Sequence, residues 1–427
     1  MPASPDVVPL DARGRILKAA FDLLAREGSA AVTAKAIAEA ADVAISTLYL
    51  SFDDKESIVV EAIEYGTRLW LGNVHPLPAP SADLAASVVA AIRTITQDLL
   101  TSNDFWRIGL LFALSNPGTG ALRMSDLRTQ TFGEVAGWWR SALDRVGLQA
   151  SKQQAKALAL LLLSSVGAIQ LAGRADAHFI DEIPRITARL GSALSSVAMR
   201  LVTSPNTIYA ADSRCRKHLI SAVAPTAPTK EHKRDLILSS TLSLLAHEGY
   251  RNTTIARITK EAGVSSSSIY WICPNKEELL QHAIDWAADD WYSTVPPFLP
   301  IVDASGWVTR FIDQIDHYLA SNLRSPQFLL AGLQLILENY PDGPPEALHH
   351  MTRIRATARS RMAAWLKDVA TGFDESCITA AELALFISAL LDETFSLHFV
   401  NRETGIPPLH VQLIGRLVEA LTEPAAD

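Results

Sequence analysis

The sequence predicts an all-α protein made of two fused copies of one helical unit. Residues 16–63 and 237–284 match each other without a gap at a constant shift (249 − 28 = 221), and about a third of the paired positions are identical. Apolar residues recur at helical spacing along most of the chain, and no long segment shows the period-two alternation of strands between hairpin turns. The duplication and the helical periodicity together set the fold class.

In each copy, an amphipathic first helix is followed by a glycine and then by a threonine. We expect the glycine to end the first helix, because glycine enters the left-handed conformation at little cost. The hydroxyl of the threonine can then cap the second helix. The paired residues are Gly28 with Gly249 and Thr33 with Thr254.

A short second helix, a tight turn and a third helix follow. The second helices cover 34–41 and 255–262, and the turns are Asp42-Val43 and Gly263-Val264. The third helices start near Ala44 or Ser265 and run through Tyr49 or Tyr270. Two helices joined by a turn of three to four residues form a helix-turn-helix pattern.

Both copies resemble the N-terminal DNA-binding domain of the TetR/AcrR family of bacterial transcriptional regulators. The matching features are the helix-ending Gly, the Thr, the turn Val, the Leu/Ile-Tyr pair of the third helix and the Lys-Glu that opens the fourth. Two residues depart from the family pattern. Asp42 stands where the turn usually carries Gly, and Cys273 replaces a packed Phe, which is Phe52 in the first copy. Asp tolerates left-handed backbone and Cys can be buried, so both domains should remain intact.

The resemblance implies that the third helix enters the major groove and that the Tyr and Lys contact phosphates. The chemistry agrees, because a phenol can donate to phosphate and helix starts favour anions. The expected phosphate contacts are Thr33, Tyr49, Lys55, Thr254, Tyr270 and Lys276. Base reading is expected from Ala44, Ile45, Ser46 and Thr47 in the first copy, and from Ser265, Ser266, Ser267 and Ser268 in the second. Apolar side chains can meet thymine methyls and Ser can bond several base edges, so no operator sequence follows.

Two alternatives weaken this interpretation. The first is that these residues are ordinary surface residues of packed helices. The second is that one copy has lost DNA binding and survives as scaffold. The first copy is the weaker candidate for binding, since segment 10–41 holds five basic residues against four acidic ones. Segment 230–260 holds six basic residues against four acids, counting Glu261 just beyond it.

Length and composition fit a soluble regulator of several domains. At 427 residues, two to four domains are expected. A net charge of −8 does not indicate nucleic-acid binding by the whole surface, but local basic faces remain compatible with it. The three cysteines have no metal-ligand or disulfide spacing, which fits a reducing bacterial cytoplasm. We therefore expect no cofactor and no metal site.

No membrane segment is expected. The N-terminus, 1–14, reads as a flexible arm without a signal region. The most apolar run, 157–173, is short for a span and contains Ser164, Ser165 and Gln170, so it is interpreted as a buried helix.

The chain divides into five expected parts. These are a DNA-binding domain at 10–70, a helical effector domain at 80–202, a linker at 203–230, a second DNA-binding domain at 231–291 and a second effector domain at 300–422. Further helices are expected at about 104–115, 121–146, 151–173 and 179–202, with breaks at 116–118, Gly147 and Gly173. The second half should repeat this plan at 307–319, 327–339, 351–371, 379–400 and 409–421. The basic cluster 214–218 lies in the linker and is interpreted as a solvated charge run.

Members of the TetR/AcrR family with one such unit per chain act as homodimers on palindromic operators. The two units in this sequence therefore suggest a pseudo-dimer within one chain. The helices around 151–173 and 379–400 are expected to form its internal four-helix interface, on an asymmetric or imperfectly palindromic operator. The alternative is that each chain dimerises again.

The resemblance also implies repression relieved by a small-molecule inducer held among the effector helices. The candidate pocket residues are aromatic: Trp106, Phe112, Trp138, Trp139, Trp307, Phe328 and Trp365. Core packing is the competing role for each of them.

Two other functional classes compete with a regulator. An enzyme is disfavoured because the sequence has no GxSxG elbow, no P-loop, no HExxH and no GxGxxG after a strand. A helical ligand-binding or interaction module that no longer binds DNA remains the main alternative.

Overall fold

The computed structural model describes residues 11–28, 32–101, 103–115, 119–205, 230–294, 298, 306–340, 342–370, 373, 375–400 and 406–423. The side chains of 27, 71–73, 103, 119–129, 230–232 and 400 are not described. Most of the expected linker, with its basic cluster, and the breaks at 116–118 therefore lie outside the described residues.

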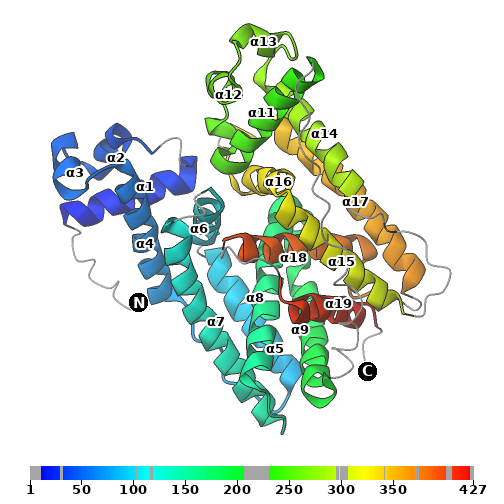
Figure 1. Cartoon of the computed structure of the whole chain (residues 1–427). Coiled ribbons are helices and arrows are strands. Elements are labelled where there is room, and N and C mark those ends of the chain that lie inside the picture. The colour runs from blue at the N-terminus through cyan, green and yellow to red at the C-terminus, as the bar shows by residue number, and fades with distance from the viewer. Residues whose placement is uncertain are drawn as a thin grey trace.

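The described chain is all-α, without a strand, as the sequence predicts. The first half contains α1 (Ala12–Glu27), α2 (Ala34–Ala41), α3 (Ile45–Ser51), α4 (Lys55–Asn73), α5 (Leu84–Thr101), α6 (Asn103–Ser115), α7 (Thr119–Arg145), α8 (Lys152–Ala175) and α9 (His178–Thr203). The second half contains α11 (Lys230–Asn252), α12 (Ile255–Ala262), α13 (Ser266–Tyr270), α14 (Lys276–Thr294), α15 (Trp307–Arg324), α16 (Gln327–Leu337), α17 (Glu346–Val369), α18 (Ala380–Val400) and α19 (Pro408–Thr422). The two helix-turn-helix units, α1–α3 and α11–α13, lie at separate corners of the molecule (Figure 1).

The caps and turns of the two units form as their residue types predict. Thr33 and Thr254 cap α2 and α12 by accepting the backbone N–H of Ala36 (3.1 Å) and Arg257 (3.3 Å). The turn residues after these helices are both left-handed: Asp42 at φ 52° and Gly263 at φ 62°. Asp therefore occupies the position that the second copy gives to glycine. Cys273 is 1% exposed, so it fills a core position as expected.

The glycines after the first helices behave differently from the prediction in two respects. Gly28 (φ 78°, ψ −179°) and Gly249 (φ 80°, ψ 175°) have positive φ but extended ψ, a region that is essentially restricted to glycine. Gly28 follows α1, as predicted, whereas Gly249 only kinks α11, which resumes and runs to Asn252. The predicted break at Gly173 is also wrong, because α8 continues through it to Ala175.

The two glycines allow a matched test of what Gly249 does. A Cβ at Gly28 would meet nothing within 4 Å, whereas one at Gly249 would fall 1.6 Å from Oε1 of Glu338. Gly28→Ala should therefore cost only backbone strain, about 1–3 kcal/mol. Gly249→Ala carries the same strain plus displacement of Glu338, so its loss should be larger by about 1–3 kcal/mol. Chemical denaturation of both variants measures the difference, and equal losses would contradict a close packing of Glu338 on Gly249.

The two halves contact each other through α8 and α18, which cover the segments expected at about 151–173 and 379–400, and also through α9 and α19, which were not expected there. Helix α8 packs against α18, and α9 against α19, with the members of each pair crossing in the view of Figure 1. The approach of α8 to α18 is close, since a Cβ at Gly167 would lie 2.6 Å from the Glu393 side chain. Ion pairs reinforce the contact between α9 and the second half, with Arg185 2.6 Å from Glu382 and Arg200 3.0 Å from Glu423.

The two DNA-binding units differ in whether their hydrophobic core is separate from that of the effector regions. The α1–α4 unit has a separate core, which Ile108 of α6 joins and against which Phe112 packs. The α11–α14 unit instead shares one continuous core with both effector regions, because α16 lies against α11 over much of its length. The second unit is therefore more firmly attached to the rest of the protein.

Among the helices that the structure describes, α5 and α8 are long and apolar enough to span a membrane by length and composition alone. In α8, 78% of the most apolar window is buried inside the protein, as expected for the run 157–173. Its apolar side chains are thus used by the contacts with α7, α9 and α18.

Candidate nucleic-acid interface

The first copy presents its candidate DNA-contacting residues on one exposed helix and the helix start that follows it. Ile45 is 47% and Tyr49 is 56% exposed on α3, while Leu48 between them is fully buried and anchors the helix. Ala44 is the N-cap residue of α3, Ala44 and Ser46 are exposed, and Thr47 is half-buried. Lys55 begins α4 and is exposed, so its ammonium is available to a phosphate.

The second copy offers a polar version of the same surface. Tyr270 is 56% exposed, the same fraction as Tyr49, and Ile269 is the buried anchor of α13. The hydroxyl of Ser265 lies 2.8 Å from that of Ser267 and 3.0 Å from that of Ser268. Ser266 is exposed as well. These hydroxyls bond to each other in the unbound protein, and each can rotate toward a base edge or phosphate.

Lys276 differs from its counterpart Lys55. It is half-buried, and its Nζ donates to the backbone oxygen of Tyr250 (2.7 Å) and lies 3.8 Å from the centre of the Tyr250 ring. Burial lowers the pKa of this ammonium, partly against the attraction of Glu277 and Glu338. In this conformation Lys276 is bound to its own domain, whereas Lys55 is exposed.

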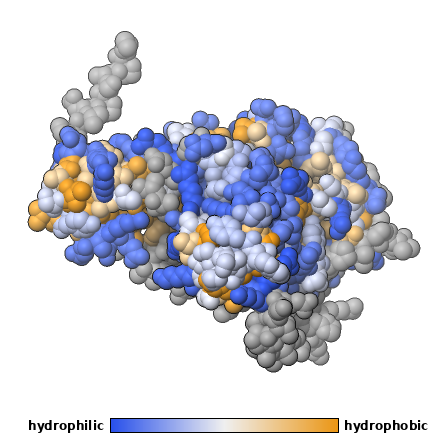
Figure 2. Space-filling model, turned by 90° about the horizontal axis from the view of Figure 1, so that it is seen from above, coloured by the Kyte–Doolittle hydropathy of each residue, from blue (hydrophilic) through white to orange (hydrophobic). Residues whose placement is uncertain are grey.

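One pair of exposed residues beside the tyrosines was not predicted from the sequence. Leu50 and Trp271 are related by the same shift of 221 positions (271 − 50 = 221), and they are 87% and 89% exposed. Large apolar side chains that are this exposed, next to a predicted DNA contact, are candidates for contact with sugar or bases. Figure 2 shows hydrophobic surface on the end of the molecule that the first copy forms, at the left.

The C-terminal end of α16 connects both DNA-binding units to the effector helices. Arg107 of α6 is 1% exposed and donates to the backbone oxygens of Leu337 (3.0 Å) and Ala25. The side chain of Asn339 also donates to the Ala25 oxygen (2.7 Å). Glu338 accepts the backbone N–H of Tyr250 (2.9 Å). Residues 337–339 thus contact the end of α1 and the second unit at the same place.

We expect Glu338 to make the stability of this junction depend on pH. Burial raises its pKa to about 7, although the Tyr250 N–H and the charges of Arg251 and Lys276 oppose the shift. A carboxyl whose folded pKa exceeds its unfolded value stabilises the fold at low pH, and that contribution is lost as pH rises through the folded pKa. We expect the loss between about pH 5 and pH 8 to be on the order of 3 kcal/mol.

The Glu338→Gln variant isolates this effect, because glutamine keeps an acceptor for Tyr250 but does not titrate in this range. The difference in unfolding free energy between wild type and variant should shift in favour of the variant as pH rises. A constant difference from pH 5 to pH 8 would mean that Glu338 is ionised throughout.

The predicted ligand-pocket residues are only partly brought together. Trp138 and Trp139 are buried core residues, with the Trp138 indole donating to the Pro78 oxygen (2.8 Å). Trp106 is a half-buried residue packed against the large core, and Phe112 packs against the α1–α4 unit. In the second half, Phe328 lines a cavity, whereas Trp307 and Trp365 meet edge to face in an aromatic cluster beside it. Trp365 does not line the cavity itself, but it packs against Phe298, which does.

That cavity, of about 490 Å³, is enclosed by α14–α18 and contains residues that the sequence analysis did not select. They include Trp291 and Tyr292 of α14 and Arg355 and Arg359 of α17. A signal for the arginines exists in the sequence. Arg355 and Arg359 are one helical turn apart and interrupt the apolar row that Met351, Met362 and Leu366 form.

Comparison with known proteins agrees with the geometry of the two units. Residues 16–62 and 237–283 each match the family described as bacterial regulatory proteins, tetR family. A solved structure from Clostridium perfringens, described as a fatty acid metabolism regulator, aligns with 20% identity and a TM-score of 0.33, over 41% of this chain and 96% of its own. No curated protein matches the chain. With a matched segment in each half and helix-turn-helix geometry in both, the chain carries two tandem domains of the tetR family of bacterial regulatory proteins.

Proposed function

We propose that the chain is a sequence-specific transcriptional repressor, released from its operator by a small-molecule ligand. The observation that carries this proposal is the pair of exposed third helices, α3 and α13, each with an equally exposed tyrosine (Tyr49 and Tyr270). Tyrosine hydroxyls and a helix-start lysine are suited to hold phosphates on either side of a reading helix. No enzymatic role is proposed, and the cytoplasm is the proposed location.

The proposed active form is a pseudo-dimer within one chain. The contacts of α8 with α18 and of α9 with α19 supply an internal interface of the kind that a second subunit would otherwise provide. Because the reading residues differ, with two apolar residues (Ala44 and Ile45) in the first copy and four serines in the second, the two halves of the operator need not match. We therefore propose an asymmetric or imperfectly palindromic operator, read by domains at 10–70 and 231–291.

Light scattering coupled to gel filtration tests the pseudo-dimer. A pseudo-dimer should elute with the mass of one chain, 46.3 kDa. The internal interface already uses α8, α9, α18 and α19, so no second copy is needed to cover them. A species of twice that mass at micromolar concentration would contradict the pseudo-dimer. It would leave DNA binding itself untouched.

Selection of genomic fragments by the purified protein tests the regulator itself. Enriched fragments that share an asymmetric motif, bound at least 10³-fold tighter than random DNA at one fixed salt concentration, are expected. Uniform recovery of fragments would contradict sequence-specific binding.

A helical module in which one copy no longer binds DNA is the second candidate, and one observation favours it for the α11–α14 unit. The Lys276 ammonium is already held by Tyr250, whereas its counterpart in the first unit, Lys55, is exposed. The salt series described in the Discussion separates the two candidates.

A further inference from the structure

The cavity of the second half combines an apolar wall with half-buried cationic side chains. Its volume of about 490 Å³ is in the range of small-molecule sites. The apolar part of the wall comes from five helices and includes Trp291, Ile315, Tyr318, Phe328, Leu329 and Met362. Among the described residues that line it, Arg355, Arg359 and Arg361 carry charge and none is acidic.

The arginines are not equivalent. Arg355 forms an ion pair with Asp392 of α18, which lies behind it and is 3% exposed. The other terminal nitrogen of Arg355, Nη1, is buried without a hydrogen-bond partner among the described residues. Arg361 is exposed at the rim, 5.8 Å from the centre of the Tyr292 ring.

Arg359 is the charge that no neighbour neutralises. In the part of the chain that the structure describes, no carboxylate lies within ion-pair distance of it; Asp392 and Asp176 act on it only from further away. Burial and the neighbouring Arg355 lower its pKa. The charges of Arg355 and Asp392 compensate each other, so the positive charge of Arg359 is left inside the cavity. One negative charge in the cavity would compensate it and supply an acceptor for Nη1 of Arg355.

We propose that this cavity binds an amphipathic monoanion, with a carboxylate held by Arg359 and Arg355 and an apolar chain or ring packed among the aromatic residues. Two guanidinium groups one helical turn apart present several N–H donors to the same carboxylate. This inference names the ligand class of the regulator and so rests on the proposed function for its consequence, though not for the binding itself.

A ligand in the cavity could change the position of the second DNA-binding unit, because α14 connects the two. Helix α14 begins at Lys276, beside the proposed DNA surface, and its last turns carry Trp291 and Tyr292 into the cavity wall. The Tyr292 hydroxyl donates to the Ile354 backbone oxygen (3.0 Å), which ties α14 to the arginine-bearing α17. A ligand that separates these helices would therefore move the start of α14.

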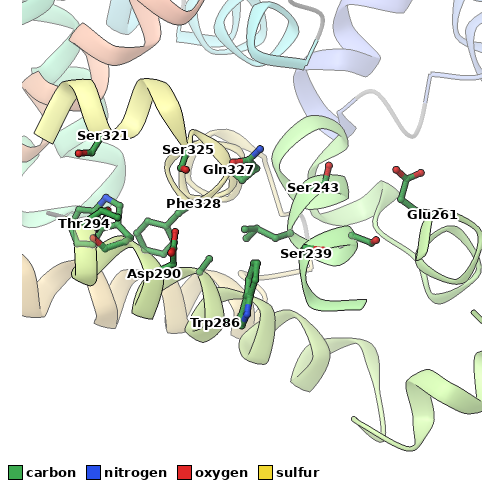
Figure 3. Close-up of a pocket in the computed structure, with 14 residues that line it drawn as sticks. Ser239, Ser243, Glu261, Trp286, Asp290, Thr294, Ser321, Ser325, Gln327 and Phe328 are labelled. Carbon is green, nitrogen blue, oxygen red and sulfur yellow. Dashed lines mark hydrogen bonds between the residues drawn. The ribbon is translucent and has the colours of Figure 1, made fainter. Parts of the chain in front are cut away.

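A polar groove provides a neighbouring surface on the outside. Figure 3 shows its lining, with Trp286, Asp290 and Thr294 on one face of α14 opposite residues of α11 and α16. Trp291 and Phe328, whose ring centres are 5.3 Å apart, line both the groove and the cavity. These two rings separate the groove from the cavity. A ligand that entered from the groove would have to pass between them to reach the arginines.

Calorimetry on the full chain with matched probes tests the ligand class. One pair of probes is decanoate, below its critical micelle concentration, and decan-1-ol, below its solubility limit. The other pair is aromatic, 1-naphthylacetate and 1-naphthaleneethanol. At least one carboxylate should bind about 10- to 100-fold tighter than its alcohol. In Arg359→Gln this preference should fall below about 3-fold, with the alcohol affinity unchanged. Arg310→Gln, which removes an exposed arginine from α15, should keep the full preference.

Arg359 is chosen because removing Arg355 would strand Asp392 in the core. Equal binding of carboxylate and alcohol, a preference unaffected by Arg359→Gln, or no binding in either pair would overturn the inference. The effect on DNA is measured separately, by adding the carboxylate to the protein–DNA complex. Arg359-dependent binding without release of DNA would support the ligand class and contradict ligand-driven release in the proposed function.

Discussion

Replacing Tyr49 and Lys55 together with alanine should weaken binding to the selected operator by about 100-fold at fixed salt, since two phosphate contacts of about 1–1.5 kcal/mol each are lost. Both side chains are exposed in the free protein, so their loss should not affect folding. Only the lysine releases a counterion. The slope of log affinity against log salt should therefore decrease by about 0.9.

The equivalent variant of the second copy, Tyr270→Ala with Lys276→Ala, should give a different result. Affinity should fall through the loss of Tyr270, but the slope should change less, because the Lys276 ammonium is bound to Tyr250. This variant should also lose some thermal stability, since the contact with the Tyr250 ring is removed. The measurement is fluorescence anisotropy across a salt series, beside random DNA.

Lys152→Ala is the matched control for both variants. Lys152 is an exposed lysine at the first position of α8, as Lys55 is at the first position of α4, but it lies in the effector region. Its affinity and slope should equal those of wild type. If the Tyr49/Lys55 variant also behaves as wild type, the first copy is a scaffold and the two-sided operator is wrong.

Replacing Arg355 with methionine should destabilise the free protein by about 3–5 kcal/mol, because it leaves the Asp392 carboxylate buried without its partner. Asp392 is 3% exposed, and burial already raises its pKa against the attraction of Arg355. Arg359 is the remaining cation nearby. It should recover only part of the loss.

The double variant Arg355→Met with Asp392→Leu should recover most of that stability, since replacing a buried ion pair with apolar residues is often neutral. Denaturant unfolding of wild type, both single variants and the double variant gives the coupling energy directly. Additive losses in the double variant would show that the two side chains do not stabilise each other.

The local features of the DNA-binding units could be predicted because their causes are local. Thr33 and Thr254 cap helices through contacts three residues away, and Asp42 and Gly263 turn the chain through their own φ angles. In both copies the apolar member of the Leu/Ile-Tyr pair, Leu48 or Ile269, is buried and the Tyr beside it is exposed. Both copies carry these residues at matching positions, so each feature is predicted twice from the sequence.

The difference between Lys55 and Lys276 could not be found in the same way. Both lysines occupy the same position of the repeat and both start a helix. What separates them is Tyr250, which stands where the first copy has Ser29 and whose ring and carbonyl hold Lys276. A single substitution outside the motif changes the environment of a motif residue.

By itself, the sequence determined that the protein is all-α and duplicated, with a helix-turn-helix unit in each half, because periodicity, caps and turn residues act over a few positions. Only the tertiary structure decided where a ligand would bind. The cavity is made by five helices from α14 to α18, which place Trp291 beside Phe328 and Arg355 against Asp392. Most of the aromatic residues selected from the sequence pack in the core instead, since an apolar ring satisfies a core and a pocket equally well.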